Sequence, residues 1–338
     1  MWTSLRTKPI FLAAALLFLF LAAGCVKSNQ DNAAKLGLRF VADVPLTGGT
    51  DRWDYQTINY LNDRLYISHL GSGMVTVFDL KGQRVIADIR DVPSPFGILV
   101  VPELKTVYVS SSGNQVAVID EDSLTVKKFL PAGTTPDGIA YDPGTGKIFV
   151  SDENAAMITV IDAGKNEFIG NIPFGGRVGN TQYDPVSGKI YSVSGVLHQL
   201  AEIDPVSDKI VRTWDLPDAQ PHGVYIDSVT HLAFIACQSE SILLVFDLGS
   251  GKIVSTQTIG QDADVLAFDP GLRRLYIAAE SGVLTVFSVD GGTVVKLAGG
   301  FIADKAHTIA VDKNTHRIYL PLENVDGKPV MRILEPVP

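Results

Sequence analysis

The sequence predicts an all-β fold, a seven-bladed β-propeller with four antiparallel strands in each blade. The first observation is a repeat in which an aromatic residue precedes small or apolar residues, as in LYIS, VYVS and IFVS. The aromatic residues are spaced 41 to 43 residues apart, at Tyr66, Tyr108, Phe149, Tyr191, Phe234, Tyr276 and Tyr319. An apolar stretch that ends in Asp follows about 12 residues later in five copies, as in VTVFD and LLVFD. An Asp-Pro turn precedes the aromatic residue in three copies and has the chemistry of a hairpin turn. Repeats of about 40–45 residues are typical of propeller blades.

Each copy contains four short segments with the composition of strands. In the third copy they span 138–142, 147–152, 157–162 and 167–172. The first three are rich in Val, Ile and aromatic residues, whereas the fourth is more polar. This gradient predicts inner strands packed between neighbouring sheets and an outermost strand that faces water. No segment after the first 24 residues shows a sustained helical period.

The closure of the ring can also be predicted. The seventh copy ends with its third strand, 330–334, and lacks a fourth. The segment RFVADV at 39–44 repeats RVIADI at 84–89, which is the fourth strand of the first copy. We therefore expect 39–44 to be the outer strand of the last blade, where it joins the two ends of the ring and removes an exposed sheet edge.

The first 24 residues have the organisation of a secretory signal peptide. Arg6 and Lys8 precede an unbroken apolar run over 10–23, which is shorter than the roughly 20 residues of a membrane span. The run leads into LAAGC, which resembles a bacterial lipobox and implies that Cys25 carries a lipid. The alternative is ordinary cleavage that leaves Cys25 as a free thiol. Residues 25–37 are expected to form a polar tether, and 38–338 a single propeller domain.

These features predict an exported protein that a lipid anchors to a membrane, in the periplasm or at the cell surface. In a host with two membranes the lipobox resemblance implies the outer membrane, because Val26 is not the Asp that retains lipoproteins at the inner one. The chain has 28 basic and 37 acidic residues, a net charge of −9, which argues against a nucleic-acid partner. Its 2 cysteines exclude a disulfide scaffold and clusters that need several thiolates. The absence of CxxCH excludes covalent haem of the c type.

The unit at 118–151 resembles the YVTN-type propeller repeat, and residues 38–335 as a whole are similar to YncE-like proteins. The resemblance implies the propeller fold and an exported, often surface-associated binding protein. Some proteins with this fold are lactonases, lyases or nucleic-acid binders, so the fold alone does not decide the function.

One residue of each copy is expected at the mouth of the central channel, where the innermost strand begins. Aligning the copies on the aromatic residue gives Asp54, Phe96, Asp137, Gly179, His222, Asp264 and His307. Blades five, six, seven and one are neighbours in a closed ring, so His222, Asp264, His307 and Asp54 should form a polar arc. Loops between the second and third strands add His69, Asp152, Glu153, Gln238, Glu280 and Glu323 on the same face.

The chemistry of this arc leaves three interpretations open. Imidazole and carboxylate groups suit a divalent metal such as Zn, Mn or Fe, with His222, Asp264, His307 and Asp54 as ligands. They also suit general acid–base catalysis, because a carboxylate raises the pKa of a neighbouring imidazole. The third interpretation is that the groups only solvate a water-filled channel. No other cofactor is indicated.

The sequence therefore predicts a binding module for a protein or a small ligand, with a site that includes Asp54, Asp137, His222, Asp264, His307, His69 and Glu280 at the channel mouth. The alternative is a lactonase- or lyase-like enzyme that uses the same arc, with or without a metal. A further alternative is a subunit of an envelope assembly that uses the rim of the ring.

Overall fold

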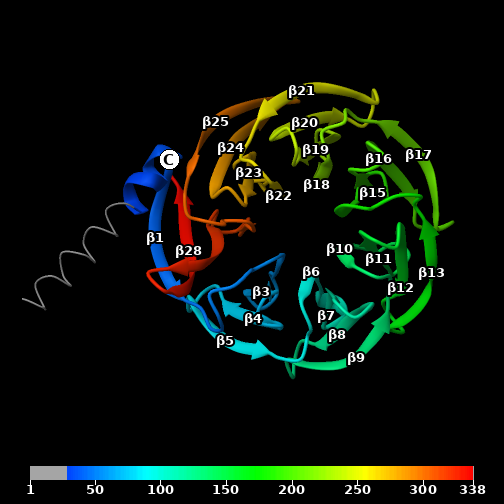
Figure 1. The fold of residues 1–338 in the computed structure, drawn as a ribbon, viewed down its shortest axis with the longest axis horizontal. Coiled ribbons are helices and arrows are strands. Elements are labelled where there is room, and N and C mark those ends of the chain that lie inside the picture. The colour runs from blue at the N-terminus through cyan, green and yellow to red at the C-terminus, as the bar shows by residue number, and fades with distance from the viewer. Residues whose placement is uncertain (1–28, 338) are drawn as a thin grey trace, which may run out of the picture.

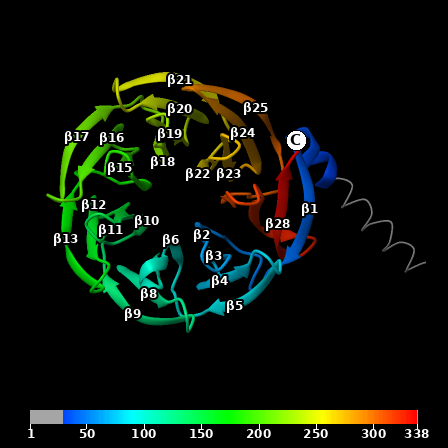
Figure 2. The same cartoon turned by 180° about the vertical axis from the view of Figure 1, so that it is seen from behind.

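The computed structural model describes residues 29–337, and it confirms a seven-bladed β-propeller. Seven four-stranded antiparallel sheets surround a central channel (Figures 1 and 2). The innermost strands are β2 (Gln56–Asn59), β6 (Pro95–Val101), β10 (Pro136–Asp142), β14 (Thr181–Asp184), β18 (Pro221–Asp227), β22 (Ala263–Asp269) and β26 (Ala310–Val311). The second strands are β3 (Arg64–His69), β7 (Thr106–Ser111), β11 (Lys147–Asp152), β15 (Lys189–Ser194), β19 (Leu232–Cys237), β23 (Arg274–Ala279) and β27 (Ile318–Val325).

The two outer positions of each blade complete the sheets. The third strands are β4 (Met74–Asp79), β8 (Gln115–Asp120), β12 (Met157–Asp162), β16 (Gln199–Asp204), β20 (Ile242–Asp247), β24 (Val283–Asp290) and β28 (Lys328–Pro336). The outermost strands are β5 (Arg84–Ile89), β9 (Thr125–Pro131), β13 (Glu167–Pro173), β17 (Lys209–Asp215), β21 (Lys252–Thr258), β25 (Thr293–Phe301) and β1 (Leu38–Pro45). A 3₁₀ turn, η1 (Pro102–Leu104), links β6 to β7.

The predicted closure is confirmed by the pairing of β1. The last sheet has the order β1-β28-β27-β26, so the first strand of the domain is the outer strand of blade seven. In this antiparallel pair Phe40 lies opposite Leu334, and Asp43 lies opposite Arg332. The N-terminal and C-terminal segments thus share one sheet, which leaves no open blade in the ring.

The core is divided among the interfaces between neighbouring blades. Each of the seven apolar clusters draws its side chains from two adjacent sheets. The repeated aromatic residue of β3, β7, β11, β15, β19, β23 and β27 is buried in every blade. This explains the strongest repeat in the sequence, because each interface needs the same large side chain to fill the space between two twisted sheets.

The Asp that ends the innermost strand in blades three to seven has a structural role. These residues are at most 5% exposed, and each carboxylate accepts a hydrogen bond from the backbone N–H two residues later. They are Asp142, Asp184, Asp227, Asp269 and Asp312. The Asp-Pro marker of the repeat is therefore turn chemistry, as predicted.

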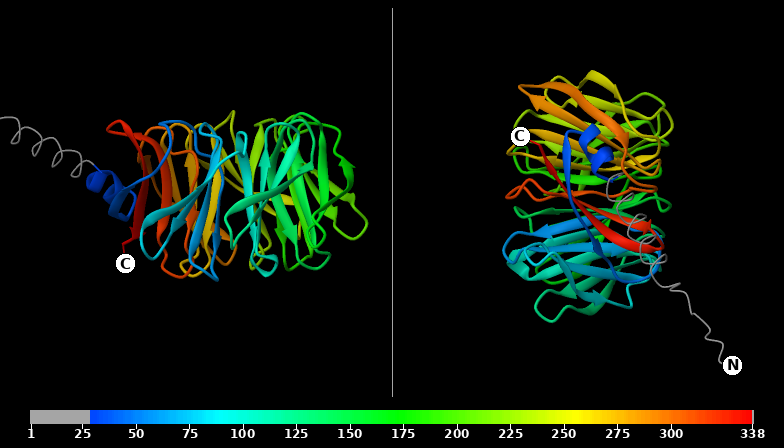
Figure 3. Two further views of the ribbon diagram at one scale, coloured as in Figure 1. Left: turned by 90° about the horizontal axis from the view of Figure 1, so that it is seen from below. Right: turned by 90° about the vertical axis from the view of Figure 1, so that its left-hand side faces the viewer.

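The structure corrects the expected tether over the part that it describes. Residues 29–35 are helical, and this helix lies against the edge of blade seven (Figure 3). Ala33 and Leu36 are 0% and 2% exposed and belong to the apolar cluster of blades six and seven. Two apolar side chains three positions apart lie on one side of a helix, which is why this short polar segment packs instead of extending. The predicted signal peptide and Cys25 lie outside the described residues. Within the described part of the chain, no helix is both long and apolar enough to span a membrane.

Candidate ligand-binding site at the channel mouth

The start of each innermost strand places its side chains at one end of the channel. Asp137, His222 and Asp264 are the second residues of β10, β18 and β22, whereas Asp54 and His307 lie just before β2 and β26. Asp264 lies at the centre of the resulting cluster. Its Oδ1 is 3.3 Å from His222 Nε2, and its Oδ2 is 3.6 Å from His307 Nε2. His307 Nε2 is also 3.7 Å from Asp54 Oδ1. The structure thus brings together the four residues of the predicted arc.

Arg52 completes one half of this mouth and was not found by sequence alignment. Its Nη1 donates a hydrogen bond to Glu280 Oε1 at 2.7 Å, and its Nη2 is 3.1 Å from His307 Nε2. Its Nε is 3.9 Å from Asp54 Oδ2. Arg52 lies two residues before Asp54, outside the one position per blade that the alignment of the repeats assigns to the mouth.

The other half of the mouth contains Asp137, Glu153 and His222. One ligand atom from each of the three lies within 4.8 Å of the others. Arg177 Nη2 is 2.7 Å from Glu153 Oε2 and is a second cation that sequence alignment missed. Together with Arg52, Asp54 and Asp264, these residues line a hollow of about 340 Å³.

This geometry revises the predicted metal ligands. Among residues 29–337, Asp54, Asp264 and His307 belong to no group of three with metal-ligand spacing, whereas His222 does. The physical reason is Arg52, whose guanidinium lies against Asp54 and His307 and supplies positive charge where the ion was expected.

The carboxylates at the mouth are held in different protonation regimes. Burial raises the pKa of Asp54, although His307 and Arg52 favour its charged form. Burial also raises the pKa of Asp137 well above its usual range, and the Asp54 and Asp264 carboxylates add to the rise. For Asp264 burial opposes ionisation, but the neighbouring histidines and Arg52 outweigh it and lower the pKa. Burial disfavours the His307 imidazolium, yet Asp54 and Asp264 outweigh it and raise its pKa. Asp264 is therefore the carboxylate of the mouth whose charged form its neighbours stabilise most.

A hydrogen-bonded bridge closes the channel beneath the mouth. The Tyr55 hydroxyl of blade one donates to Asn180 Oδ1 of blade four, and it lies 3.5 Å from Asp264 Oδ1. Asn180 Nδ2 donates to the same Asp264 oxygen at 3.2 Å. Blades one and four stand on different sides of the ring, so this bridge spans the channel (Figure 1).

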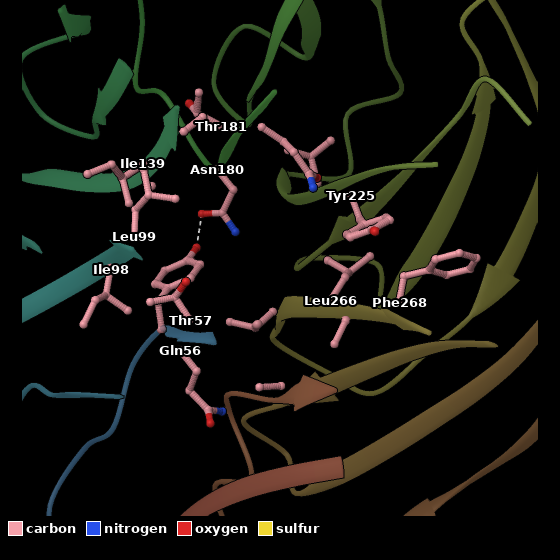
Figure 4. A pocket seen from close by; sticks show the side chains of 18 of the residues that line it. Gln56, Thr57, Ile98, Leu99, Ile139, Asn180, Thr181, Tyr225, Leu266 and Phe268 are labelled. Carbon is pink, nitrogen blue, oxygen red and sulfur yellow. Dashed lines mark hydrogen bonds between the residues drawn. The ribbon is translucent and has the colours of Figure 1, made fainter. Parts of the chain in front are cut away.

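Below the bridge the channel widens into a cavity of about 580 Å³, which the sequence analysis did not predict. Figure 4 shows Asn180 with its hydrogen bond among the apolar residues that line it. The lining includes Ile98, Leu99, Ile139, Leu266 and Phe268. Alternate residues of the innermost strands point into the channel, and here they are apolar on several blades.

His69 does not join the mouth, contrary to expectation. Its side chain is 0% exposed and stacks on Trp53, with ring centroids 3.5 Å apart. Its Nε2 lies 2.6 Å from Asp51 Oδ1. A Cβ on Gly48 would lie 2.6 Å from the His69 ring, so the segment after β1 covers this histidine. Burial lowers the pKa of His69 despite Asp51, which agrees with a packing role.

Of the other residues expected on this face, four line the hollows at the mouth and Asp152 does not. Phe96 and Gln238 line the hollow around Asp137, while Glu280 and Glu323 line an adjoining hollow of about 310 Å³ with Arg52 and His307. Asp152 is buried and accepts backbone hydrogen bonds from Thr135, Asn154 and Ala155, so it shapes loops and does not face the mouth.

Comparisons with known proteins support the fold and little beyond it. No family model matches the sequence. A segment of 105 residues is 30% identical to antigen Lp49 of Leptospira interrogans, covering 27% of this chain and 23% of that protein. The structure is similar to a chain of hydrazine synthase from Kuenenia stuttgartiensis, with a TM-score of 0.71 and 17% identity. That match covers 82% of this chain and 94% of the other, and at this identity it shows a shared propeller fold alone.

Proposed function

We propose that this chain is an exported, lipid-anchored propeller that binds a protein or a small ligand at the channel mouth. The observation that carries the proposal is a cluster of buried polar atoms without hydrogen-bond partners. Arg52 Nε, Asp54 Oδ1 and His307 Nδ1 are buried and make no hydrogen bond within residues 29–337, although each lies 3.5–3.9 Å from an ion-pair partner. An unsatisfied buried polar group destabilises a protein by about 1–3 kcal/mol, so such a cluster is typical of a site where a ligand supplies the missing partners.

The charge of the mouth favours a ligand with an amine or guanidinium group. Carboxylates outnumber cations around the two adjoining hollows, and the Glu280 side chain is 40% exposed. Hollows of about 310 and 340 Å³ are within the range of small-molecule sites and also accept one long side chain of a protein partner. Buried carboxylates in such a hollow bind a cationic group through charge-assisted hydrogen bonds.

Ligand titration of the full-length chain tests this proposal. The chain is purified in detergent with EDTA present, and spermidine, L-arginine and a lysine-rich peptide are added as probes in calorimetry. We expect saturable binding of at least one probe, which His307→Ala and Asp54→Asn abolish. Asp122→Asn, at a 70% exposed side chain, is the control and should bind as the parent does.

Two outcomes would contradict the binding module. If the three probes fail to bind, or if Asp122→Asn weakens binding as much as Asp54→Asn, the mouth is not the site. If the chain hydrolyses simple lactones and His307→Ala abolishes this turnover, the enzyme alternative replaces the proposal.

The proposal includes membrane anchoring through Cys25 and membership of the YncE-like family with YVTN-type repeats. Both are supported by the sequence, and the propeller fold agrees with the second. Metabolic labelling with a fatty acid tests the anchor. The parent chain should incorporate label, and Cys25→Ala should not. A Cys25→Ala chain that is cleaved and still fractionates with membranes as the parent does would contradict lipidation.

A further inference from the structure

Asp137, Glu153 and His222 form a compact set of metal-ligand atoms at the mouth, in the hollow of about 340 Å³ that Arg52 and Arg177 also line. Asp137 begins β10 and Glu153 follows β11, so blade three supplies both carboxylates, while blade five supplies His222. Their three ligand atoms lie within 4.8 Å of one another. Ligand atoms that share one ion at about 2.0–2.2 Å are at most about 4.4 Å apart, so small side-chain rotations bring these three onto one ion. No other group of three with this spacing occurs in residues 29–337.

The glycine of blade four makes room for this arrangement. Gly179 occupies the aligned mouth position between Asp137 and His222 in the ring. A Cβ on Gly179 would lie 2.8 Å from the backbone oxygen of His222, which is closer than real Cβ atoms approach. The glycine therefore lets blades four and five pack closely here. It also leaves no side chain between the carboxylates of blade three and the imidazole of blade five.

Asp137 is a buried carboxylate without a partner. Its side chain lines the hollow and, within residues 29–337, makes no hydrogen bond and no ion pair, whereas its backbone oxygen accepts a hydrogen bond from Ser110 Oγ; the residue is 7% exposed. Leaving a charge buried and unpaired is expensive, so proteins pair such groups or use them to coordinate metals. This makes Asp137 an independent indication that something cationic binds in the hollow.

The other two members each place one ligand atom close to the other, although each side chain also faces a second charged group. Glu153 uses Oε2 for Arg177, at 2.7 Å, while its Oε1 is 4.0 Å from His222 Nε2. His222 Nε2 also faces Asp264 Oδ1 at 3.3 Å. A metal ion binds the neutral imidazole and displaces its proton, and the two carboxylates then supply a charge of −2 that a divalent cation balances.

We infer that Asp137, Glu153 and His222 bind one divalent first-row transition metal ion, of the class of Zn²⁺ or Mn²⁺. One imidazole and two carboxylates are the donors these ions prefer, and the imidazole favours them over Ca²⁺ and Mg²⁺. The inference goes beyond the proposed function, because it concerns a metal ion held by residues of blades three and five, and not an organic or protein ligand. Three protein ligands leave at least one coordination position open toward the hollow, as in metal sites that also contact a ligand.

Zinc titration of the untagged full-length chain tests the inference. After removal of metals with EDTA and exchange into chelator-free buffer, calorimetry with Zn²⁺ should show one ion per chain, and Mg²⁺ should not compete. His222→Gln and Asp137→Asn should each weaken Zn²⁺ binding by about 10–100-fold or more, the loss seen when metal sites are perturbed. His231→Asn is the matched control, because His231 is an exposed histidine of the same blade, with a φ of 55° that Asn tolerates.

Asp137→Asn keeps the test independent of folding. The substitution preserves side-chain size and replaces a carboxylate that makes no hydrogen bond within residues 29–337, so the variant is expected to fold. Absence of saturable Zn²⁺ binding by the parent, or unchanged affinity in Asp137→Asn, would overturn the site. An equal loss in His231→Asn would also overturn it, because it would indicate diffuse surface binding. The Zn²⁺ titration contains no organic probe, and the ligand titration contains EDTA. A negative result in one experiment therefore contradicts only the site which that experiment tests.

Discussion

Removing the carboxylate of Asp43 is expected to destabilise the whole ring, because this residue pairs with a buried arginine at the closure. Arg332 is 2% exposed, and its Nε and Nη2 donate to the two Asp43 oxygens at 2.8 and 2.7 Å. Its Nη1 donates to the Ile302 backbone oxygen at 2.8 Å. In Asp43→Ala the guanidinium keeps that last bond and loses its counter-ion. Removing one partner of a buried ion pair costs about 3–5 kcal/mol.

The same pair of strands provides a matched control. Arg39 on β1 pairs with Glu335 on β28, and the Arg39 side chain is 63% exposed. An exposed pair contributes about 0.2–1 kcal/mol, so Arg39→Ala should change the free energy of unfolding little. Asp43 also accepts a bond from Asn29 at 3.2 Å, which accounts for about 1 kcal/mol of any loss.

Urea unfolding of the three chains measures the difference. Asp43→Ala should lose at least about 2 kcal/mol more than Arg39→Ala, with an unchanged dependence on urea concentration. Asp43→Ala combined with Arg332→Met should recover most of the loss, since an apolar side chain removes the unpaired charge. If Asp43→Ala costs no more than Arg39→Ala, the buried pair does not stabilise the closure and the reasoning fails.

Three further substitutions test other parts of the structure. Leu36→Ala should lower the free energy of unfolding by about 2–4 kcal/mol in urea, and no change would mean that the helix over 29–35 is not packed. Tyr55→Phe should cost about 1 kcal/mol in the same assay, because it removes the donor of the channel bridge, and a neutral result would contradict that bridge. Burial opposes ionisation of Asp227, but the hydrogen bonds and charge of Arg273 outweigh this effect and hold the pKa of Asp227 below 3.8. The Asp227–Arg273 pair therefore stabilises the fold above pH 3.8, and this stabilisation is lost as the pH falls through the lowered pKa. Asp227→Asn should therefore be less stable by about 1.5–3 kcal/mol at neutral pH, and its stability should depend less on pH below 3.8. A parallel acid transition in both chains would contradict this.

Repetition explains why the fold could be predicted from the sequence alone. An interface that recurs seven times imposes the same buried aromatic residue on each copy, and a turn Asp recurs in blades three to seven, so the signal accumulates along the chain. The closing strand was predictable for the same reason, because RFVADV repeats a strand of blade one. The helix over 29–35 was missed because it occurs once, and only Ala33 and Leu36 bury apolar surface.

The site was predictable only where it follows the repeat. Asp54, Asp137 and His222 occupy equivalent positions, so alignment placed them on one face without a structure. Arg52 departs from the repeat and was found only by its contacts. His69 occupies a repeated position, yet the segment around Gly48 belongs to blade one alone and covers it. A feature that occurs in a single blade produces no repeat in the sequence and cannot be found by aligning the copies. Arg52 is such a feature, and it adds positive charge beside Asp54 and His307.

The bridge under the mouth determines how the two ends of the channel relate to each other. Burial raises the pKa of Tyr55 well above its usual range, and the neighbouring carboxylates add to this, so the hydroxyl stays a donor at physiological pH. It therefore keeps its bond to Asn180 while Asp264 remains ionised beside both. A ligand that enters the charged mouth meets this bridge before it reaches the apolar cavity. The bridge therefore lies between the charged mouth and the apolar cavity of the channel.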